Sequence, residues 1–170
     1  MALIEIDYKE AMAQTAESLA SGGILLTSQK AKGKPNSMAI GWGTIGSIWS
    51  RPVFIVLVRP SRYTFGLIES SGEFTVNVPP DELKDTVMYC GSVSGRDHDK
   101  FAEKNLTPLP GKAVACPIIK ECVINYECKV IHSNDLVNAN LDPEIVAAAY
   151  PKGDFHRVYF GQILRATRQG

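Results

Sequence analysis

Two apolar segments, residues 37–48 and 53–58, follow each other along the chain with only the short connection "WSRP" between them. This connection is too short for the helix that a parallel crossover requires, so we expect the segments to pair antiparallel. The first segment is punctuated by glycine, which predicts one strand with bends or bulges. The second, "VFIVLV", is a β-branched run typical of a buried strand.

Together with four further strand patterns, these segments make the strands more numerous than the helices. The four further patterns are "ILLTSQ", "EFTVNV", a long strand around residues 123–132 and the final "HRVYFGQILRA". Neighbouring strands with short connections favour a small antiparallel barrel with a few covering helices. A chain of 170 residues fits one domain, which we place over residues 1–170.

Four helical segments are predicted around these strands. Asp7 and Glu10 form a capping box at the start of the first helix, which Gly22-Gly23 ends. A short helix is expected over residues 63–70, and "DELKDTVMYC" is expected to begin another with Asp81 as its N-cap. The piece "DPEIVAAAY" gives the last one.

Composition excludes several classes of function. Lys+Arg and Asp+Glu are both 18, and the isoelectric point is about 6.8, so the basic face of a nucleic-acid-binding domain is absent. No apolar stretch approaches the ~18 residues of a membrane-spanning helix, and the first residues lack a signal-peptide pattern. We therefore expect a cytoplasmic protein with no membrane or nucleic-acid partner.

The cysteines favour packing over chemistry. None of the four forms C-x-x-C, so neither a zinc knuckle nor a thioredoxin-like motif is present, and no metal site is expected. Cys122 and Cys128 are an even number of residues apart and would share one strand face with Tyr126, as small core hydrophobes. Cys90 is placed in a polar loop and is the one cysteine left open as reactive.

Residues 41–46, "GWGTIG", match the dinucleotide-binding pattern G-x-G-x-x-G letter by letter. In that motif the last glycine opens a helix, and an acidic residue follows about 20 positions later. Here Pro52 comes six residues after Gly46, and residues 44–68 contain no acidic residue. These glycines are better explained as bends, or as a close approach of a flat ligand to the backbone.

The segment "RPSRYT", residues 59–64, ends an apolar strand with an unusual set of donors. Arg59 and Arg62 carry guanidinium groups suited to phosphate, and Ser61 and Thr64 carry hydroxyls. The N-terminus of the following helix also attracts anions. Either this corner binds a phosphate, or Ser61 caps the helix and the arginines are solvated. Two arginines at one corner would repel each other without an anion between them, which favours the phosphate.

The ordered motifs "KPNSMAIGWGTIGSIWSRPVFIVLVRPSRYT", "SSGEFTVNVP", "CGSVSGRDHDKF" and "HRVYFGQIL" resemble the flavin reductase-like family. Within it they are most like flavoredoxins and their relatives. The resemblance implies a mainly β fold with peripheral helices, an antiparallel split β-barrel that binds FMN non-covalently. It also implies a homodimer with the flavin near the subunit interface.

The resemblance assigns three groups of residues to the FMN. The phosphate group is Arg59, Ser61, Arg62 and Thr64. The residues along the isoalloxazine and ribityl chain are Asn36, Ser37, Met38 and Thr44. A second loop over the flavin contributes Ser94, Gly95, Arg96 and Lys100. From the residues alone, this loop is equally explained as solvated, with Asp97 and Asp99 balancing its two cations.

No residue is assigned a definite catalytic role, and Lys100 and His156 are the two candidates. Lys100 or Arg96 near the N1/O2 edge would stabilise a reduced flavin by charge. His156 matches a position near the flavin or nicotinamide in relatives, but a lone histidine at a strand end is also an ordinary surface residue. Trp42 and Trp49 would stack on the ring, or lie in the core or a dimer interface.

The leading hypothesis is an FMN-binding oxidoreductase that passes hydride from NADH or NADPH to FMN and electrons onward. The alternative is a non-enzymatic FMN electron carrier that serves a redox partner protein. A barrel that binds oligonucleotides is disfavoured by the neutral charge and the few aromatics. Residues 133–154 match the family least, and we expect them to shape the substrate mouth.

Overall fold

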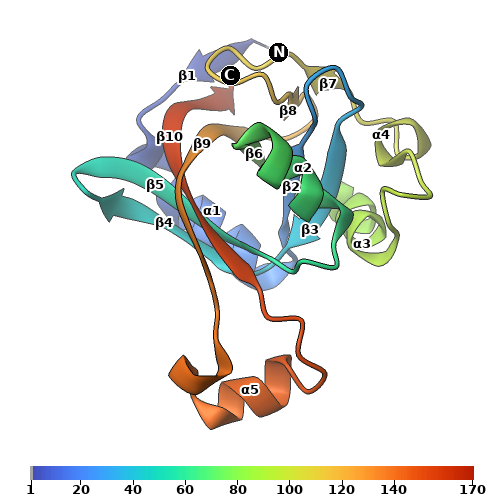
Figure 1. Ribbon diagram of the computed structural model, residues 1–170. Coiled ribbons are helices and arrows are strands. Elements are labelled where there is room, and N and C mark those ends of the chain that lie inside the picture. Colours follow the sequence, from blue (N-terminus) through green and yellow to red (C-terminus); the bar gives the residue numbers. More distant parts are fainter. Residues whose placement is uncertain (1) are drawn as a thin grey trace.

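The computed structural model describes residues 2–170, and an antiparallel eight-stranded sheet is its largest element (Figure 1). Its strands are β1 (Leu3–Glu5), β2 (Ile24–Ser28), β3 (Asn36–Ile40), β4 (Gly43–Ile48), β5 (Arg51–Val58), β6 (Glu73–Val78), β9 (Ile124–Asp135) and β10 (Arg157–Gln169). They pair in the order β3-β2-β6-β9-β10-β5-β4, with β1 added on β10. The predicted mainly β, antiparallel class is confirmed.

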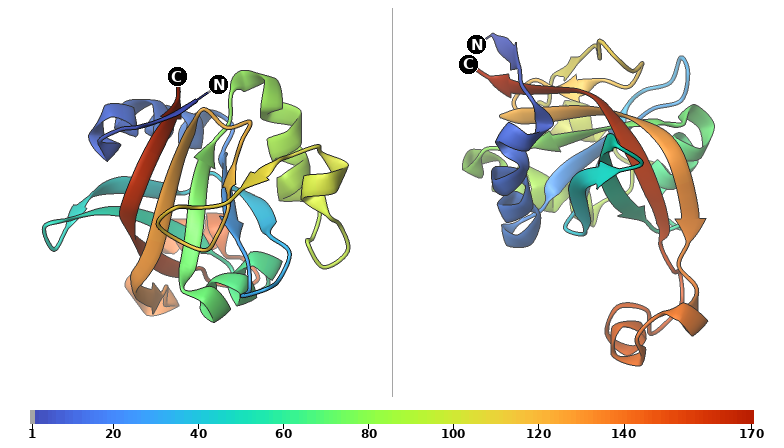
Figure 2. Two further views of the ribbon diagram at one scale, coloured as in Figure 1. Left: turned by 90° about the horizontal axis from the view of Figure 1, so that it is seen from above. Right: turned by 90° about the vertical axis from the view of Figure 1, so that its left-hand side faces the viewer.

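The segment expected to be one bent strand is instead two strands at opposite ends of the sheet. β3 pairs with β2 and β4 pairs with β5, although only Gly41 and Trp42 separate them. The sheet curls so that its two ends approach each other (Figure 2). At Gly43 a Cβ atom would lie 2.7 Å from the Ile55 carbonyl oxygen, so this tight crossing requires glycine. Strand β4, not a helix, follows the G-x-G-x-x-G match.

The predicted antiparallel pair is the hairpin of β4 and β5. Ile48 pairs with Arg51, and the two residues between them, Trp49 and Ser50, have φ values of 54° and 56°. Two consecutive positive φ angles are typical of the type I′ turn, whose twist matches that of the flanking strands. Trp49 therefore lies at an exposed hairpin tip.

Helices surround the curled sheet, and two of them lie on a part of the chain that projects from it (Figure 1). They are the α-helices α1 (Met12–Ser21), α2 (Tyr63–Ser71), α3 (Lys84–Ser92), α4 (Lys100–Glu103) and α5 (Pro143–Ala149), and the 3-10 helices η1 (Tyr8–Ala11), η2 (Asp81–Leu83) and η3 (Asn138–Asn140). The capping box is confirmed at η1, where Lys9 N–H donates to Asp7 and Asp7 N–H donates to Glu10. The Asp81 cap is wrong, because the N-cap position is Pro80 and no side chain caps it.

The core fills the inside of the curled sheet, around large aromatic residues such as Phe54 and Tyr126, both fully buried. Cys122 and Cys128 are fully buried as well, which confirms their prediction as core residues. Cys90 is not in a polar loop. It lies in α3 at 1% exposure, so the predicted loop location is wrong, and burial raises the pKa of its thiol, which disfavours the reactive thiolate.

The end of β9 and the segment that leads from it to β10 project from the rest of the sheet and carry η3 and α5 (Figure 1). This projecting part contains residues 133–154. Two further short strands, β7 (Pro108–Leu109) and β8 (Ile118–Ile119), form a separate pair near the other end of the molecule. No helix within residues 2–170 is long and apolar enough to cross a membrane.

Candidate functional site

A cavity of about 400 Å³ opens where β3, the β5–α2 corner, the loop before α4 and the start of β10 meet. It brings together most of the residues singled out in the sequence: Asn36, Met38, Arg59, Ser61, Arg62, Thr64, Ser94, Gly95, Arg96, Lys100 and His156. Its volume lies within the range typical of small-molecule sites, roughly 300–1,000 Å³.

Two of the predicted residues do not contribute side chains to this cavity. Ser37 is fully buried and its hydroxyl accepts a hydrogen bond from Thr27 at 3.2 Å, because alternate residues of β3 face opposite sides. Thr44 lies beyond the break between β3 and β4, beside a different cavity under α1. The departure of Thr44 follows from splitting the expected single strand into two, and that of Ser37 from the alternation of side chains along β3.

The start of α2 forms the polar end of the cavity. Arg62 occupies the N-cap position, and no side chain caps this helix, so the prediction of Ser61 as a cap is wrong. Thr64, in the first turn, is 1% exposed and accepts a hydrogen bond from Asn36 Nδ2 at 2.9 Å. The Thr64 hydroxyl keeps its own hydrogen for another acceptor.

The loop before α4 is docked on this corner and is not freely solvated. Arg96 donates to the Ser61 carbonyl oxygen at 3.1 Å, and its guanidinium lies 5.6 Å from the centre of the Tyr63 ring. Gly95 touches the same region so closely that a Cβ atom would collide with Asn36 and Tyr63. The loop's position therefore depends on glycine at residue 95.

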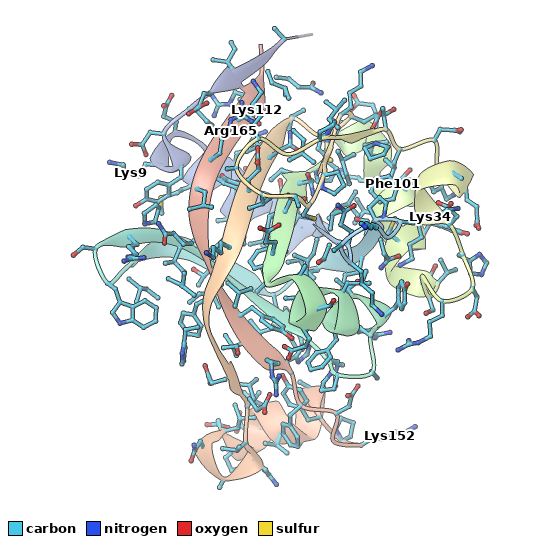
Figure 3. All side chains as sticks on the ribbon, turned by 45° about the horizontal axis from the view of Figure 1, so that its top comes forward. Lys9, Lys34, Phe101, Lys112, Lys152 and Arg165 are labelled. Carbon is cyan, nitrogen blue, oxygen red and sulfur yellow. The ribbon has the colours of Figure 1, made fainter. Side chains whose placement is uncertain are left out.

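Arg59 is already engaged by the protein itself. Its guanidinium donates to the carbonyl oxygens of Ala149 at 2.8 Å, Asp154 at 2.9 Å and Gly153 at 3.4 Å. It also lies 4.9 Å from the centre of the Tyr150 ring. Arg59 thus fastens the connection between α5 and β10 to the corner. That connection also carries Lys152, which points outward (Figure 3).

Asp154 places a carboxylate at the same corner. The Ser61 hydroxyl donates to Asp154 Oδ2 at 2.5 Å, and Ser61 N–H donates to Asp154 Oδ1 at 3.4 Å. Both Ser61 donors expected to hold a phosphate therefore meet an acid of the chain. Nothing in the sequence marks Asp154 or Tyr150, because both lie in or next to the segment that matches the family least.

Lys100 is a buried cation at the inner end of the cavity. It is 4% exposed, and its Nζ donates to the carbonyl oxygens of Cys90 at 2.7 Å and Ser37 at 2.9 Å. Burial lowers the pKa of Lys100, and the charge of Arg62 lowers it further. Two of the three ammonium hydrogens are used by these carbonyls, which leaves one for a ligand.

His156 is a buried residue of the cavity wall, at 8% exposure, and not an ordinary surface histidine. Its Nδ1 is hydrogen-bonded to the Tyr150 hydroxyl at 2.6 Å, and its ring centre lies 5.3 Å from that of Trp42. Burial, together with the charge of Arg59, lowers the pKa of His156 to about 4. The imidazole is therefore neutral at pH 7.

These features fit a ligand with an anionic end and a flat polar body. Arg62, Arg96 and the first turn of α2 supply positive charge at one end of the cavity. Met38 and Leu57 add apolar surface to the wall, and Lys100 adds a buried donor. Trp42 lines the same wall but is half exposed, whereas Trp49 lies at the hairpin tip away from the cavity.

Comparisons with known proteins agree with this arrangement. An uncharacterized protein of Archaeoglobus fulgidus is 34% identical over 134 residues; the match covers 79% of this chain and 66% of that relative, just under two thirds of its length. The flavoredoxin of Desulfovibrio vulgaris (Miyazaki F) superimposes with a TM-score of 0.70 at 26% identity, over 86% of this chain and 69% of that one.

A flavoredoxin from Methanosarcina acetivorans superimposes with a TM-score of 0.67 at 29% identity, over 86% of this chain and 68% of that one. The profile described as the flavin reductase like domain matches residues 16–168, which include every strand of the main sheet except β1. The chain belongs to the flavin reductase-like domain family.

Proposed function

We propose that this protein is an FMN-binding oxidoreductase that accepts hydride from NADH or NADPH and passes electrons to a second acceptor. Bound FMN supplies the hydride-accepting chemistry, so the protein has only to bind, orient and tune it. The observation that carries the proposal is the cavity itself. It is lined by an uncapped helix start, by two arginines and by a buried lysine.

The phosphate of FMN is assigned to Arg62, Arg96 and Thr64 at the start of α2. The Thr64 hydroxyl has a free hydrogen, and both guanidinium groups line the cavity. Arg59 also lines the cavity, but three of its five N–H donors bind backbone carbonyls. We propose that it supports the site by holding the α5–β10 connection in place.

The ring of FMN is assigned to the part of the cavity lined by Met38, Lys100 and His156. The remaining ammonium hydrogen of Lys100 would donate to the ring edge that gains negative charge on reduction. His156 is neutral at pH 7, so it would offer a hydrogen bond rather than a second charge. Trp42 beside it would limit access of water.

Replacing Lys100 distinguishes its effect on FMN affinity from its effect on the reduction of bound FMN. Lys100→Met should slow the reduction of FMN by NADH more than it weakens FMN binding, since the lost charge matters most for the reduced state. Stopped-flow absorbance and fluorescence titration measure the two effects. Lys104→Met is the control, because Lys104 lies outside the cavity against Tyr89. Equal losses of both quantities would contradict the tuning role.

The deciding experiment is the visible spectrum of FMN-loaded protein before and after anaerobic addition of NADH, then NADPH. Prompt bleaching of the flavin bands is the expected result and identifies the electron donor. Bleaching by dithionite alone would reject the reductase. It would favour the second candidate, an FMN electron carrier that serves a redox partner protein, as the similarity to flavoredoxins suggests.

We also propose that the chain forms a homodimer through the surface around α5. Trp42, Val137 and Ile145 are 50%, 47% and 49% exposed, and Trp42 and Ile145 line one apolar hollow of about 430 Å³. Exposed apolar surface of this kind marks interaction sites. Light scattering should give twice the mass of the chain, and Ile145→Glu should give monomers. A monomeric wild-type protein would contradict the proposal.

A further inference from the structure

The carboxylate of Asp154 accepts hydrogen bonds at the strand-to-helix corner of residues 59–64. Asp154 is 93 residues from its partner Ser61 in the sequence. It accepts the Ser61 hydroxyl at 2.5 Å and the Ser61 N–H at 3.4 Å. An oxygen of an FMN phosphate that bound Ser61 would have to take this place. The two anions therefore compete for the same donors.

Positive charge surrounds this position. The Arg96 guanidinium donates to the carbonyl oxygen of Ser61 itself, and Arg59 donates to the carbonyl oxygen of Asp154. Without a ligand, the Asp154 carboxylate compensates part of this charge. With a phosphate bound nearby, the same carboxylate would repel it, because both are negative.

The Asp154 side chain is free to leave while its backbone stays. The residue is exposed, and Ser61 is the one residue among 2–170 to which its carboxylate is hydrogen-bonded. Its backbone, by contrast, is held by Arg59 through the neighbouring carbonyls. Its φ of 56° lies in the left-handed region, which aspartate and asparagine tolerate better than most residues.

We propose that Asp154 is a specificity-determining residue, an internal anion that competes with the phosphate of the flavin for Ser61. This inference rests on the proposed function. Asp154 lowers the affinity for FMN and leaves the affinity for riboflavin, which has no phosphate, nearly unchanged. The protein therefore discriminates less between the two flavins than its arginines alone would allow, and bound FMN exchanges more readily.

Asp154→Asn tests the inference, because asparagine keeps the shape and the left-handed backbone but removes the charge. Titration by flavin fluorescence should show FMN binding roughly ten-fold tighter, equivalent to about 1.4 kcal/mol. Riboflavin affinity should change by less than about two-fold, because no phosphate is present to gain. Asp154→Gly, which also suits a positive φ, should give at least the same gain.

Asp142→Asn is the matched control. Asp142 caps α5 on the same projecting part, with its carboxylate accepting from Glu144 N–H at 2.8 Å, but it does not line the cavity. Asparagine caps a helix as well as aspartate does. The control removes one negative charge from the same part of the molecule and should leave the affinity for both flavins unchanged.

A double-mutant cycle with Ser61→Ala tests whether Asp154 affects FMN binding through Ser61. If Asp154 acts through Ser61, the gain from Asp154→Asn should shrink in the Ser61→Ala background, because the contested hydroxyl is gone and only the Ser61 N–H remains. A gain of the same size in both backgrounds would overturn competition for Ser61.

The failure of this inference can be told from the failure of the proposed function. Two outcomes would overturn the role of Asp154 alone. In the first, the wild type binds FMN and the FMN affinity is unchanged in Asp154→Asn and Asp154→Gly. In the second, the affinity for riboflavin rises as much as the affinity for FMN. No binding of FMN by any of these proteins would overturn the proposed function and this inference with it. Thermal unfolding of each variant verifies that it is folded.

Discussion

Among the carboxylates that accept backbone N–H groups, Glu127 and Asp154 do so in opposite settings. Glu127 on β9 is 2% exposed and accepts the N–H groups of Lys112, Ala113 and Val114 at 2.6–3.2 Å, with Arg165 at 2.9 Å on its other oxygen. Figure 3 shows Lys112 and Arg165 together over this part of the sheet. Asp154 is exposed, and within residues 2–170 Ser61 is the residue to which its carboxylate is hydrogen-bonded.

The difference lies in what could replace each carboxylate. Residues 111–114 close over Glu127 so tightly that a Cβ atom on Gly111 would meet the Cys116 carbonyl oxygen at 2.6 Å. Glu127 and Val114 are buried although Lys112 and Ala113 are exposed, and an unpaired buried N–H is costly. At Asp154, water or a ligand oxygen can reach Ser61. Burial therefore separates a structural carboxylate from an exchangeable one.

The largest expected effect is on Glu127. Glu127→Gln should lower the free energy of unfolding by roughly 3–5 kcal/mol, because it leaves the Arg165 side chain, which is 10% exposed, and the buried Val114 N–H without their anion. Urea denaturation followed by circular dichroism measures the loss. Glu5→Gln is the control, since Glu5 binds the same arginine at 3.1 Å but is 71% exposed. Similar losses for both would break the comparison.

A second prediction tests whether the cavity wall near Asp154 is as accessible to water as Asp154 itself. The pKa of His156 is lowered to about 4. Below pH 6.5 the unfolded chain takes up this proton and the folded protein does not, so stability is lost as pH falls from about 6.5 to about 4. The loss is at most about 3 kcal/mol.

His156→Gln cannot take up that proton and should flatten this part of the curve of unfolding free energy against pH. His98→Gln, at an exposed residue, should keep the wild-type slope, because His156 is still present. If the dependence of unfolding free energy on pH were the same in His156→Gln as in the wild type, His156 would be accessible to water in the folded protein. The cavity wall would then be open to solvent, like Asp154 and unlike the buried Glu127.

The smallest expected effect is on the stability of Asp154→Asn. Its unfolding free energy should stay within about 0.5 kcal/mol of wild type, as is usual for an exposed residue, while its FMN affinity rises. Thermal melts without flavin measure this. A large loss of stability would show that the Ser61–Asp154 contact is structural, which would remove the contrast with Glu127.

Much of the site was predictable because its residues are close together in the sequence. The donors of residues 59–64 lie on one strand-to-helix corner. Residues of "SGRDHDK" line the same cavity, as the family resemblance of the ordered motifs implies. Ser37 and Thr44 could not be sorted from the sequence. Whether their side chains face the cavity depends on where the strands within residues 37–48 begin and end. An apolar run with glycines is compatible with one strand or two.

The sequence by itself determined the antiparallel sheet, the core face of β9 and the positions of most helices. These depend on alternation, turns and breakers within a few residues, and such signals are local. It also determined which residues carry charge and hydroxyl groups at the corner.

Only the tertiary structure decided which of those groups remain free. Arg59 binds carbonyls 90 to 95 residues away, Ser61 binds a carboxylate 93 residues away, and Lys100 is buried against a carbonyl 63 residues away. These partners meet because β9 and β10 bring the α5–β10 connection back to the corner and α3 and α4 pack on β3. No local pattern reports such meetings, since hydrogen-bonding capacity is a property of the residue and its satisfaction is a property of the fold.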